Sequence, residues 1–546
     1  MKTYTHIVLF LLKGENNLYV PMLLSQFLDR AVKLYGEKTA LIDDDKSFTY
    51  AEVNDRVNQL SRGLSHVGIE KGDRVAYLAP NSSEMFEGFY GVFQIGAIIV
   101  PLNTRLIPSD YEYILNHSET KVLFVDHELV GHIEPIRKNL KTVEKIIVHG
   151  GKDETEWTIP YEEWLARFEK APTDRPEMDE KDIATLLYTS GTTGKPKGVM
   201  LSHRSNYLHA LTTMHHLRVS DRDTLLHILP MFHVNGWGSP FYYTANGATQ
   251  VCLRKVQPEE IFGKIDSYKV TVMHMAPTVL NTLLQYAGSS KIAKQEQDIR
   301  IVIAGSAPPP AFVKRVEEEL KWEFIQVYGM TEAAPLITTS IIRDTQSDVS
   351  KEEKYRLKAK AGYEYIGAEV RVVNEFGENV AQDGKEIGEV IVRSNTVMEG
   401  YLNNQEGTDE VIRNGFYHTG DMAIVDANGN IEIADRKKDI IISGGENISS
   451  IEVESALYDH PAVLEVAVIS IPHEKWGETP QAIVVKREGL DVTEEELIAF
   501  SRSRLAHFKA PTKIVFKTEL PKTASGKIQK VHLRKEYWQE KEKFIN

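Results

Sequence analysis

Residues 188–198 read Tyr-Thr-Ser-Gly-Thr-Thr-Gly-Lys-Pro-Lys-Gly, and this loop is the most informative part of the chain. Its glycines allow positive φ angles and a close approach of the backbone to a ligand. Its hydroxyl groups can donate hydrogen bonds, and its lysines carry positive charge. These properties suit a polyphosphate. The loop is not a Walker A loop, because the glycine spacing differs and Pro196 follows Lys195 where Ser or Thr would stand.

The loop resembles the phosphate-binding motif of the AMP-forming acyl-CoA synthetases. This family belongs to the adenylate-forming superfamily, which also contains luciferases and peptide-synthetase adenylation domains. Five further segments resemble motifs of the family and occur in the family's order. They are the acid motif 230–237, the nucleotide motif 327–332, the ribose motif 417–421, the hinge 435–439 and the C-terminal lysine motif 521–528. The resemblance extends to both ends of the chain and is greatest for bacterial medium- and long-chain fatty-acid–CoA ligases.

Composition narrows the function without deciding it. A formal net charge of −14 argues against a nucleic-acid-binding protein. An acidic protein can still bind ATP, because a local loop and a metal ion set the field at the site. Cys252 is the single cysteine, so an internal disulfide and a cysteine-rich metal site are excluded. The sequence also has no HExxH, GxSxG or CxxC pattern, which leaves no basis for a zinc hydrolase, a serine esterase or a thiol-redox enzyme.

The N-terminus carries a short apolar run at residues 7–12. Six residues cannot span a bilayer, and no clear signal-peptide cleavage site follows. We therefore expect the fold to begin near Tyr19 and the enzyme to be cytoplasmic. Peripheral contact with a membrane and assembly into a homodimer stay open at this stage.

Hydrophobic periodicity predicts an α/β fold with two domains. From about residue 38 to 330, buried strands (75–78, 121–125, 145–148 and 301–304) alternate with helical patterns such as 84–96, which predicts mostly parallel sheets covered by helices. Short strands at 369–373, 389–392 and 430–433 predict a small antiparallel β unit. Strands at 463–471, 482–486 and 514–517 with a helix at 494–505 predict a small α+β unit. The expected domains are 1–434 and a mobile C-terminal domain, 435–546.

The resemblance implies a reaction in two halves. A carboxylate attacks the α-phosphate of Mg·ATP to give an acyl adenylate and pyrophosphate, and the thiol of coenzyme A then displaces AMP. The first half needs no general base, because a carboxylic acid is already ionised near pH 7. The site must instead overcome the repulsion between two anions. Cationic groups, Mg²⁺ and backbone N–H donors do so.

Site residues follow from the same resemblance. The phosphate loop is expected to cradle the β- and γ-phosphates, and Glu332 is expected to hold Mg²⁺ together with Thr189. Without the motif around it, Glu332 would be interpreted as a helix-start carboxylate. The expected phosphate-binding residues are Thr189, Ser190, Gly191, Thr192, Thr193, Gly194 and Lys195.

The nucleotide and ribose motifs are expected to bind adenosine. Tyr328 would stack on adenine, Asp421 would accept hydrogen bonds from the ribose hydroxyls, and Arg436 would assist at the ribose or the α-phosphate. The remaining residues expected at this site are Gly305, Ser306 and Ala307 as the other adenine wall, and Gly329, Met330 and Thr331 of the nucleotide motif.

The acid motif supplies the expected substrate pocket: His233, Val234 and Trp237. His233 would flank the incoming carboxylate, although a histidine beside aromatic residues is also common in ordinary cores. Trp237 resembles the gate tryptophan of bacterial fatty-acyl-CoA synthetases. An indole can close an apolar tunnel and be moved by one hydrogen bond at its N–H. The alternative for Trp237 is an ordinary pocket wall.

The last unit would serve both half-reactions. Lys527 is expected to act in adenylation, where the alternative is a solvated surface lysine. Asp435 would be the hinge about which this unit docks in two orientations. The residues expected to line the pantetheine tunnel are Lys438, Gly444, Gly445 and Glu446.

The leading hypothesis is a CoA ligase for medium- or long-chain fatty acids. The closest alternative is a CoA ligase for an aryl or other small carboxylic acid on the same fold, and a luciferase-type oxygenase is a remote one. A peptide-synthetase adenylation module is disfavoured, because no carrier domain follows Lys530 and His233-Val234-Asn235 stands where an aspartate for the ammonium group would be. A non-catalytic nucleotide-binding protein would be expected to have lost motif residues, and none is lost.

Overall fold

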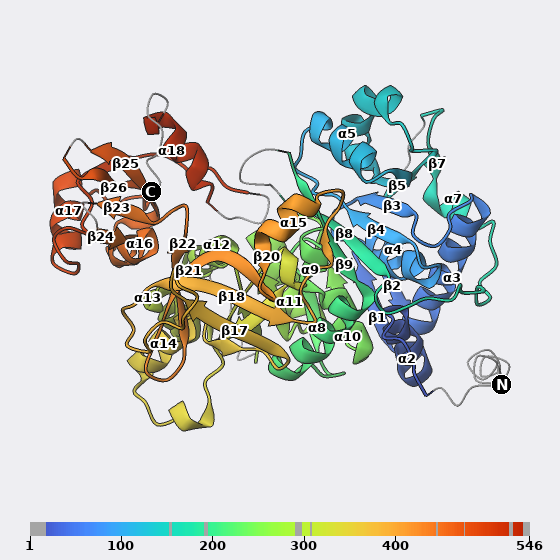
Figure 1. The fold of residues 1–546 in the computed structure, drawn as a ribbon. Helices are drawn as coiled ribbons and strands as arrows, with labels where there is room; N and C mark the ends of the chain where they lie inside the picture. Colours follow the sequence, from blue (N-terminus) through green and yellow to red (C-terminus); the bar gives the residue numbers. More distant parts are fainter. Residues whose placement is uncertain are drawn as a thin grey trace.

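The computed structural model describes residues 18–151, 155–189, 195–289, 298–305, 308–443, 446–473, 475–523 and 528–538. The predicted α/β class is confirmed. Two large sheets lie side by side in the N-terminal part, and a small antiparallel sheet and a C-terminal unit follow (Figure 1).

The first large sheet has eight strands in the order β19-β9-β8-β4-β3-β5-β6-β7. Neighbours from β8 to β7 are parallel, and β9 and β19 add an antiparallel edge. The strands are β3 (Arg74–Leu78), β4 (Ile98–Pro101), β5 (Thr120–Asp126), β6 (Lys145–His149), β7 (Ile159–Pro160), β8 (Ile183–Thr189), β9 (Lys197–Ser202) and β19 (Gly400–Tyr401).

The second large sheet has nine strands in the order β16-β15-β14-β13-β12-β10-β11-β1-β2. Its central strands are parallel, as predicted from their near-continuous apolar runs. The strands are β1 (Thr39–Asp43), β2 (Lys46–Thr49), β10 (Thr224–His227), β11 (Thr249–Cys252), β12 (Val272–Met275), β13 (Arg300–Ile303), β14 (Glu323–Gly329), β15 (Leu336–Thr339) and β16 (Tyr363–Glu364).

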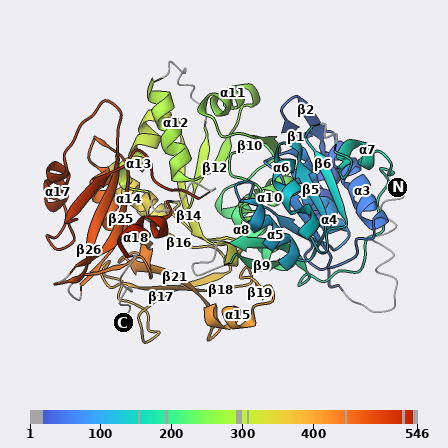
Figure 2. The ribbon, with the colours of Figure 1, turned by 90° about the horizontal axis from the view of Figure 1, so that it is seen from above.

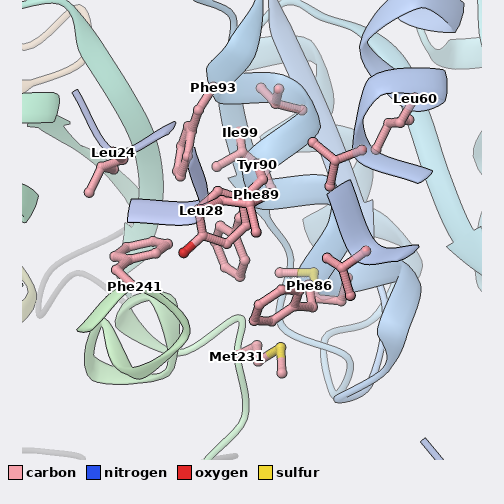
Figure 3. Packing of buried hydrophobic residues seen from close by; sticks show 14 of the residues in the cluster. Leu24, Leu28, Leu60, Phe86, Phe89, Tyr90, Phe93, Ile99, Met231 and Phe241 are labelled. Atoms are coloured by element: carbon pink, nitrogen blue, oxygen red, sulfur yellow. The ribbon is translucent and has the colours of Figure 1, made fainter. Parts of the chain in front are cut away.

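Helix α4 (Ser83–Gln94) ties the acid motif to the core. Its rings pack against α10 (Ser239–Ala245), and Phe89 meets Phe241 edge to face with ring centroids 5.3 Å apart (Figure 3). Met231 of the acid motif belongs to the same cluster. The predicted helix 84–96 ends two residues earlier, because Gly96 has a φ of 69°. The other helices used below are α2 (Ser25–Tyr35), α3 (Tyr50–His66), α5 (Pro108–His117), α8 (His203–His216), α12 (Pro277–Ser289) and α13 (Pro310–Arg315).

The small antiparallel unit is confirmed. It contains β17 (Ala368–Val373), β18 (Gly388–Ser394), β20 (Ile412–Arg413), β21 (Phe416–Val425) and β22 (Ile431–Arg436). Strand β22 is longer than predicted. It includes Asp435 and Arg436, because these residues pair with Met422 and Asp421 of β21. The predicted hinge residue therefore lies at the end of a strand and not in a loop.

In its described residues, the C-terminal unit has a five-stranded sheet and three helices. Its elements are β23 (Ile441–Ser443), β24 (Glu446–Ile448), α16 (Ser450–Tyr458), β25 (Val463–His473), β26 (Gly477–Lys486), α17 (Glu494–Arg502), β27 (Lys513–Phe516) and α18 (Lys530–Trp538). Both views place this unit at one end of the molecule, opposite α3 (Figures 1 and 2). Among the described residues, no helix is long and apolar enough to cross a membrane.

Candidate active site

Three side chains that the sequence assigned to adenosine come together at the end of β14. Asp421 and Arg436 are cross-strand partners on β21 and β22, and Arg436 Nε lies 2.8 Å from Asp421 Oδ1. The hydroxyl of Tyr328 donates to Asp421 Oδ2 at 2.8 Å. Asp421 is 4% exposed, so its charge is balanced within the protein. The same charge raises the pKa of Arg436.

A local turn fixes the position of Asp421. Gly420 has a φ of 69°, which glycine adopts without strain. The backbone N–H of Asp421 donates to Thr419 Oγ1 at 3.0 Å, and that hydroxyl donates to the Val390 carbonyl at 2.7 Å. The ribose motif is thus anchored to β18 before Asp421 emerges.

The other predicted adenine wall begins at the carboxyl end of β13. Ile303 and Gln326 are register partners on the parallel strands β13 and β14. Gly305 and Tyr328 each follow those partners by two residues, so they lie at the same edge of the sheet. Ligands of open α/β sheets bind at this edge. Gly305 has a φ of 103°, which favours glycine there. Ser306 and Ala307 lie outside the described residues.

Glu332 lies in the one-turn helix η5 (Thr331–Ala333). Its Oε1 accepts a hydrogen bond from the hydroxyl of Tyr401 at 3.0 Å. Burial raises the pKa of Glu332, while the Tyr401 hydrogen bond and the charge of Arg436 oppose that shift. Gly329 precedes this turn, and a Cβ there would lie 1.9 Å from the Pro335 carbonyl oxygen. The nucleotide motif therefore requires glycine for close backbone packing. Met330 donates its N–H to the same Pro335 carbonyl at 3.0 Å, and Thr331 is buried.

The phosphate loop connects β8 to β9. Its flanking residues Thr189 and Lys197 are paired across the two strands. The ammonium of Lys197 lies 4.8 Å from the centre of the Tyr401 ring, and that of Lys195 lies 5.0 Å from the centre of the Tyr113 ring on α5. Ser190, Gly191, Thr192, Thr193 and Gly194 lie outside the described residues. Tyr401 thus links the phosphate hairpin to Glu332.

The oxygen atoms of Thr189 and Glu332 fit the donor preference of Mg²⁺, which takes few protein ligands beside phosphates. In the part of the chain that the structure describes, no group of three or more His, Cys, Asp or Glu residues could hold a metal by itself. A carboxylate with one oxygen already oriented by Tyr401 agrees with a metal that takes its other ligands from a nucleotide.

The acid motif forms a left-handed turn that the sequence did not predict. Five consecutive φ angles are positive: Val234 47°, Asn235 54°, Gly236 59°, Trp237 55° and Gly238 74°. Left-handed residues other than glycine cost about 1–2 kcal/mol each. The turn is held by the N–H of Gly238, which donates to the Asn235 carbonyl at 2.9 Å, and by the Asn235 side chain, which donates to Thr185 and Asn206, each at 3.2 Å. Such strain is often retained at functional sites.

The predicted pocket residues sit in or beside this turn. His233 is half-buried directly before it, and Val234 and Trp237 are buried. The Trp237 indole stacks on the imidazole of His274 on β12, with ring centroids 5.8 Å apart and an interplanar angle of 21°. His274 carried no recognisable pattern in the sequence.

Asp435 is buried where the N-terminal part meets the last unit. Its Oδ2 accepts the N–H of Ser450, the first residue of α16, at 2.7 Å. Its Oδ1 accepts the N–H of Arg436 at 2.8 Å. Lys530 of α18 pairs with Glu454 of α16 at 2.6 Å on the same side. The charge of Asp435 also raises the pKa of Lys530, against the effect of burial.

Other residues predicted on this unit are only partly described. The Lys438 carbonyl accepts a hydrogen bond from Arg534 at 2.8 Å, and burial lowers the pKa of Lys438. Glu446 begins β24 and is exposed. The tunnel glycines Gly444 and Gly445 and the lysine Lys527 lie outside the described residues.

A contact between the last unit and the N-terminal part was also missed. The Tyr458 hydroxyl donates to Asn281 of α12 at 3.3 Å, and its ring meets Phe312 of α13 edge to face at 6.4 Å. A lone tyrosine at the end of a helix gives no sequence signal for such a contact.

Comparison with known proteins decides the family. A family model described as AMP-binding enzyme matches residues 28–402, and a model of its C-terminal domain matches residues 452–527. The chain belongs to the AMP-binding enzyme family. It is an AMP-forming CoA ligase, and the reaction of this family uses ATP, coenzyme A and Mg²⁺.

Relatives of this ligase act on small acids, as their names state. A peroxisomal butyrate–CoA ligase of Arabidopsis thaliana is 38% identical over 533 residues, covering 94% of this chain and 93% of the relative. A peroxisomal benzoate–CoA ligase of the same plant is 37% identical over 541 residues, covering 94% and 93%. A 4-hydroxybutyrate–CoA ligase of Metallosphaera sedula is 38% identical over 518 residues, covering 93% of each chain.

Solved structures agree. The anthranilate CoA ligase AuaEII in complex with anthranoyl-AMP has a TM-score of 0.85 at 29% identity, covering 95% of this chain and 98% of that one. ATP-bound MatB from Rhodopseudomonas palustris has a TM-score of 0.84 at 27% identity, covering 95% and 99%.

Proposed function

We propose that this ligase activates a short aliphatic or an aryl carboxylic acid and transfers it to coenzyme A. The relatives named for butyrate, benzoate and 4-hydroxybutyrate support this range. They favour the small-acid alternative over medium- and long-chain fatty acids. The observation that carries the proposal is the buried Trp237. Trp237 is 5% exposed and its indole is stacked on His274, so a long chain would have to displace packed rings.

The described geometry supports the proposed adenosine site. Tyr328 and Gly305 would flank adenine at the carboxyl ends of β14 and β13. Asp421 keeps free lone pairs for the ribose hydroxyls, because a carboxylate can accept about four hydrogen bonds. Arg436, 40% exposed at its side chain, can reach the α-phosphate while still paired with Asp421.

Thr189, Lys195 and the residues between them would hold the β- and γ-phosphates. Glu332 and Thr189 would hold Mg²⁺, which when bound neutralises phosphate charge. The positive charge of Lys197, placed over Tyr401, adds to the field that attracts a nucleotide. His233, directly before the left-handed turn, would flank the incoming carboxylate, and Val234 and Trp237 would line its pocket.

We propose a domain boundary at residues 434–435 with Asp435 as the hinge. Lys527 would act in adenylation, and Lys438, Gly444, Gly445 and Glu446 would line the path of the thiol. We retain the cytoplasm as the proposed location, although the butyrate and benzoate ligases are named as peroxisomal.

A pyrophosphate-release screen over straight-chain acids from C2 to C18 and over aryl acids, with and without coenzyme A, tests this function. We expect the highest kcat/KM with C4–C6 acids or a benzoate, and a thioester only when coenzyme A is present. A preference for straight-chain acids of C8 or longer would contradict the proposed range.

A further inference from the structure

The ring stacked beneath Trp237 is itself held from both sides. His274 lies on β12 and is 2% exposed. The Tyr242 hydroxyl lies 3.4 Å from His274 Nδ1, and the Tyr243 hydroxyl lies 3.4 Å from Nε2. Both tyrosines belong to α10, the helix that directly follows the left-handed turn, and both are fully buried.

The hydrogen bonds fix the orientation of a neutral ring. Burial lowers the pKa of His274 to about 3, so the imidazole has one N–H donor and one acceptor at neutral pH. Each nitrogen faces a hydroxyl that can donate or accept. Rotation of the imidazole about its Cβ–Cγ bond would break both contacts and leave buried polar groups unpaired.

Trp237 is therefore constrained at two points. The hydrogen-bonded left-handed turn fixes its backbone, and the oriented imidazole supports one face of the indole. A tryptophan held in this way would act as a pocket wall, the alternative to the swinging gate that the resemblance implies.

We propose that His274 is a positioning residue that makes Trp237 a fixed end wall of the acid pocket. The substrate class that follows is a short or flat acid. Longer straight chains are excluded by a rigid ring pair. This inference rests on the proposed function and adds the residue that sets the length limit.

The test compares His274→Ala with the matched control His227→Ala. His227 is an equally buried histidine on the neighbouring strand β10, and its Nε2 lies 2.9 Å from the Gln250 side chain. The measurement is kcat/KM for butyrate, hexanoate and octanoate. A hydrophobic pocket discriminates about 10-fold or more per methylene, so opening the wall should move that ratio strongly.

We expect His274→Ala to raise the octanoate-to-butyrate ratio of kcat/KM at least about 10-fold, and His227→Ala to leave it near the parent value. Tyr243→Phe, which removes one hydroxyl only, should shift the ratio in the same direction by a smaller factor, and it carries the test if His274→Ala does not fold. Suppose that the parent prefers butyrate. If the octanoate-to-butyrate ratio is then unchanged in the folded variants, or shifts equally in His227→Ala, the inference is overturned and the proposed function stands. A parent that prefers octanoate would overturn the proposed function as well.

Discussion

Replacing Asp421 by asparagine tests the proposed adenosine site most directly. The substitution keeps the shape of the side chain and removes its charge. Asparagine keeps only one acceptor oxygen, so its NH2 group would point toward either the Tyr328 hydroxyl or the Arg436 guanidinium. Tyr328 can adapt, because its oxygen can also accept a hydrogen bond. Arg436 cannot, because a guanidinium has no acceptor.

The magnitude follows from the contacts that are lost. Hydrogen bonds to charged groups contribute about 1.5–3 kcal/mol each. The ribose hydroxyls would keep a neutral acceptor in asparagine, which places the loss of binding free energy in the lower part of that range. A loss of about 1.5–2 kcal/mol corresponds to about a 10- to 30-fold rise in KM for ATP. The acid's KM should change much less, because the proposed role of Asp421 is at the ribose.

The assay is pyrophosphate release as a function of ATP concentration at saturating acid. The matched control is Glu389→Gln, on the neighbouring strand β18. Glu389 accepts the Gly420 N–H at 3.1 Å and lies 3.5 Å from the His418 ring nitrogen. We expect this control to stay within about threefold of the parent. An unchanged KM for ATP in folded Asp421→Asn, or an equal rise in the control, would refute the assignment of Asp421 to the nucleotide.

Three further predictions concern the metal, the domain contact and pH. Glu332→Gln should raise the Mg²⁺ concentration for half-maximal activity at least about tenfold, because the amide has no charge. In the parent, the pKa of Glu332 is raised, so protons should compete with Mg²⁺ at a higher pH than they do at an ordinary carboxyl group. A Mg²⁺ titration at falling pH would show this competition. Tyr458→Ala should speed proteolytic cleavage near Asp435 several-fold. Tyr458→Phe loses only the hydrogen bond of 3.3 Å to Asn281 and should resemble the parent. Equal cleavage of all three proteins would contradict a role of Tyr458 in holding the last unit against α12 and α13. Four buried histidines have pKa values lowered by burial to about 3 or about 4: His203, His209, His227 and His274. Above pH 6.5 these histidines are neutral in the folded and the unfolded chain, and the free energy of unfolding is at its full value. As the pH falls toward the folded pKa values, only the unfolded chain takes up protons, so the free energy of unfolding decreases. At pH 5 the decrease is about 2 kcal/mol per histidine. Urea midpoints measured from pH 7.5 to 5 should fall steeply below pH 6.5, and constant midpoints would contradict the prediction.

The sequence predicted the layered fold because its signals are local. A short apolar run such as 121–125 is typical of a strand in a parallel sheet, and this run lies in β5. Motif order also placed Tyr328, Asp421 and Arg436 at one site before their contacts were known. The left-handed turn could not be predicted, because valine and tryptophan seldom adopt positive φ, and the side-chain hydrogen bonds that hold the turn reach Thr185 and Asn206, which are distant in sequence.

The missed site residues fail for a different reason. Tyr401 meets Glu332 across 69 residues, and His274 on β12 meets Trp237 in the left-handed turn. Neither has a neighbour in sequence that marks it. Both contacts depend on tertiary proximity, which no periodic pattern in a single sequence reveals.

The position of Arg436 connects nucleotide binding at the proposed ribose site with rotation of the last unit at the proposed hinge. Arg436 pairs with Asp421 at the proposed ribose site, and its backbone N–H is bound by Asp435 at the proposed hinge. Asp435 also holds the first N–H of α16, so rotation of the last unit must exchange that hydrogen bond for another. A nucleotide that tightens the Asp421–Arg436 pair would therefore bias the orientation of the last unit, and by thermodynamic reciprocity each orientation would bind the nucleotide with its own affinity. The orientation of the last unit would then depend on which nucleotide is bound, and the coupling would pass through the peptide bond between Asp435 and Arg436.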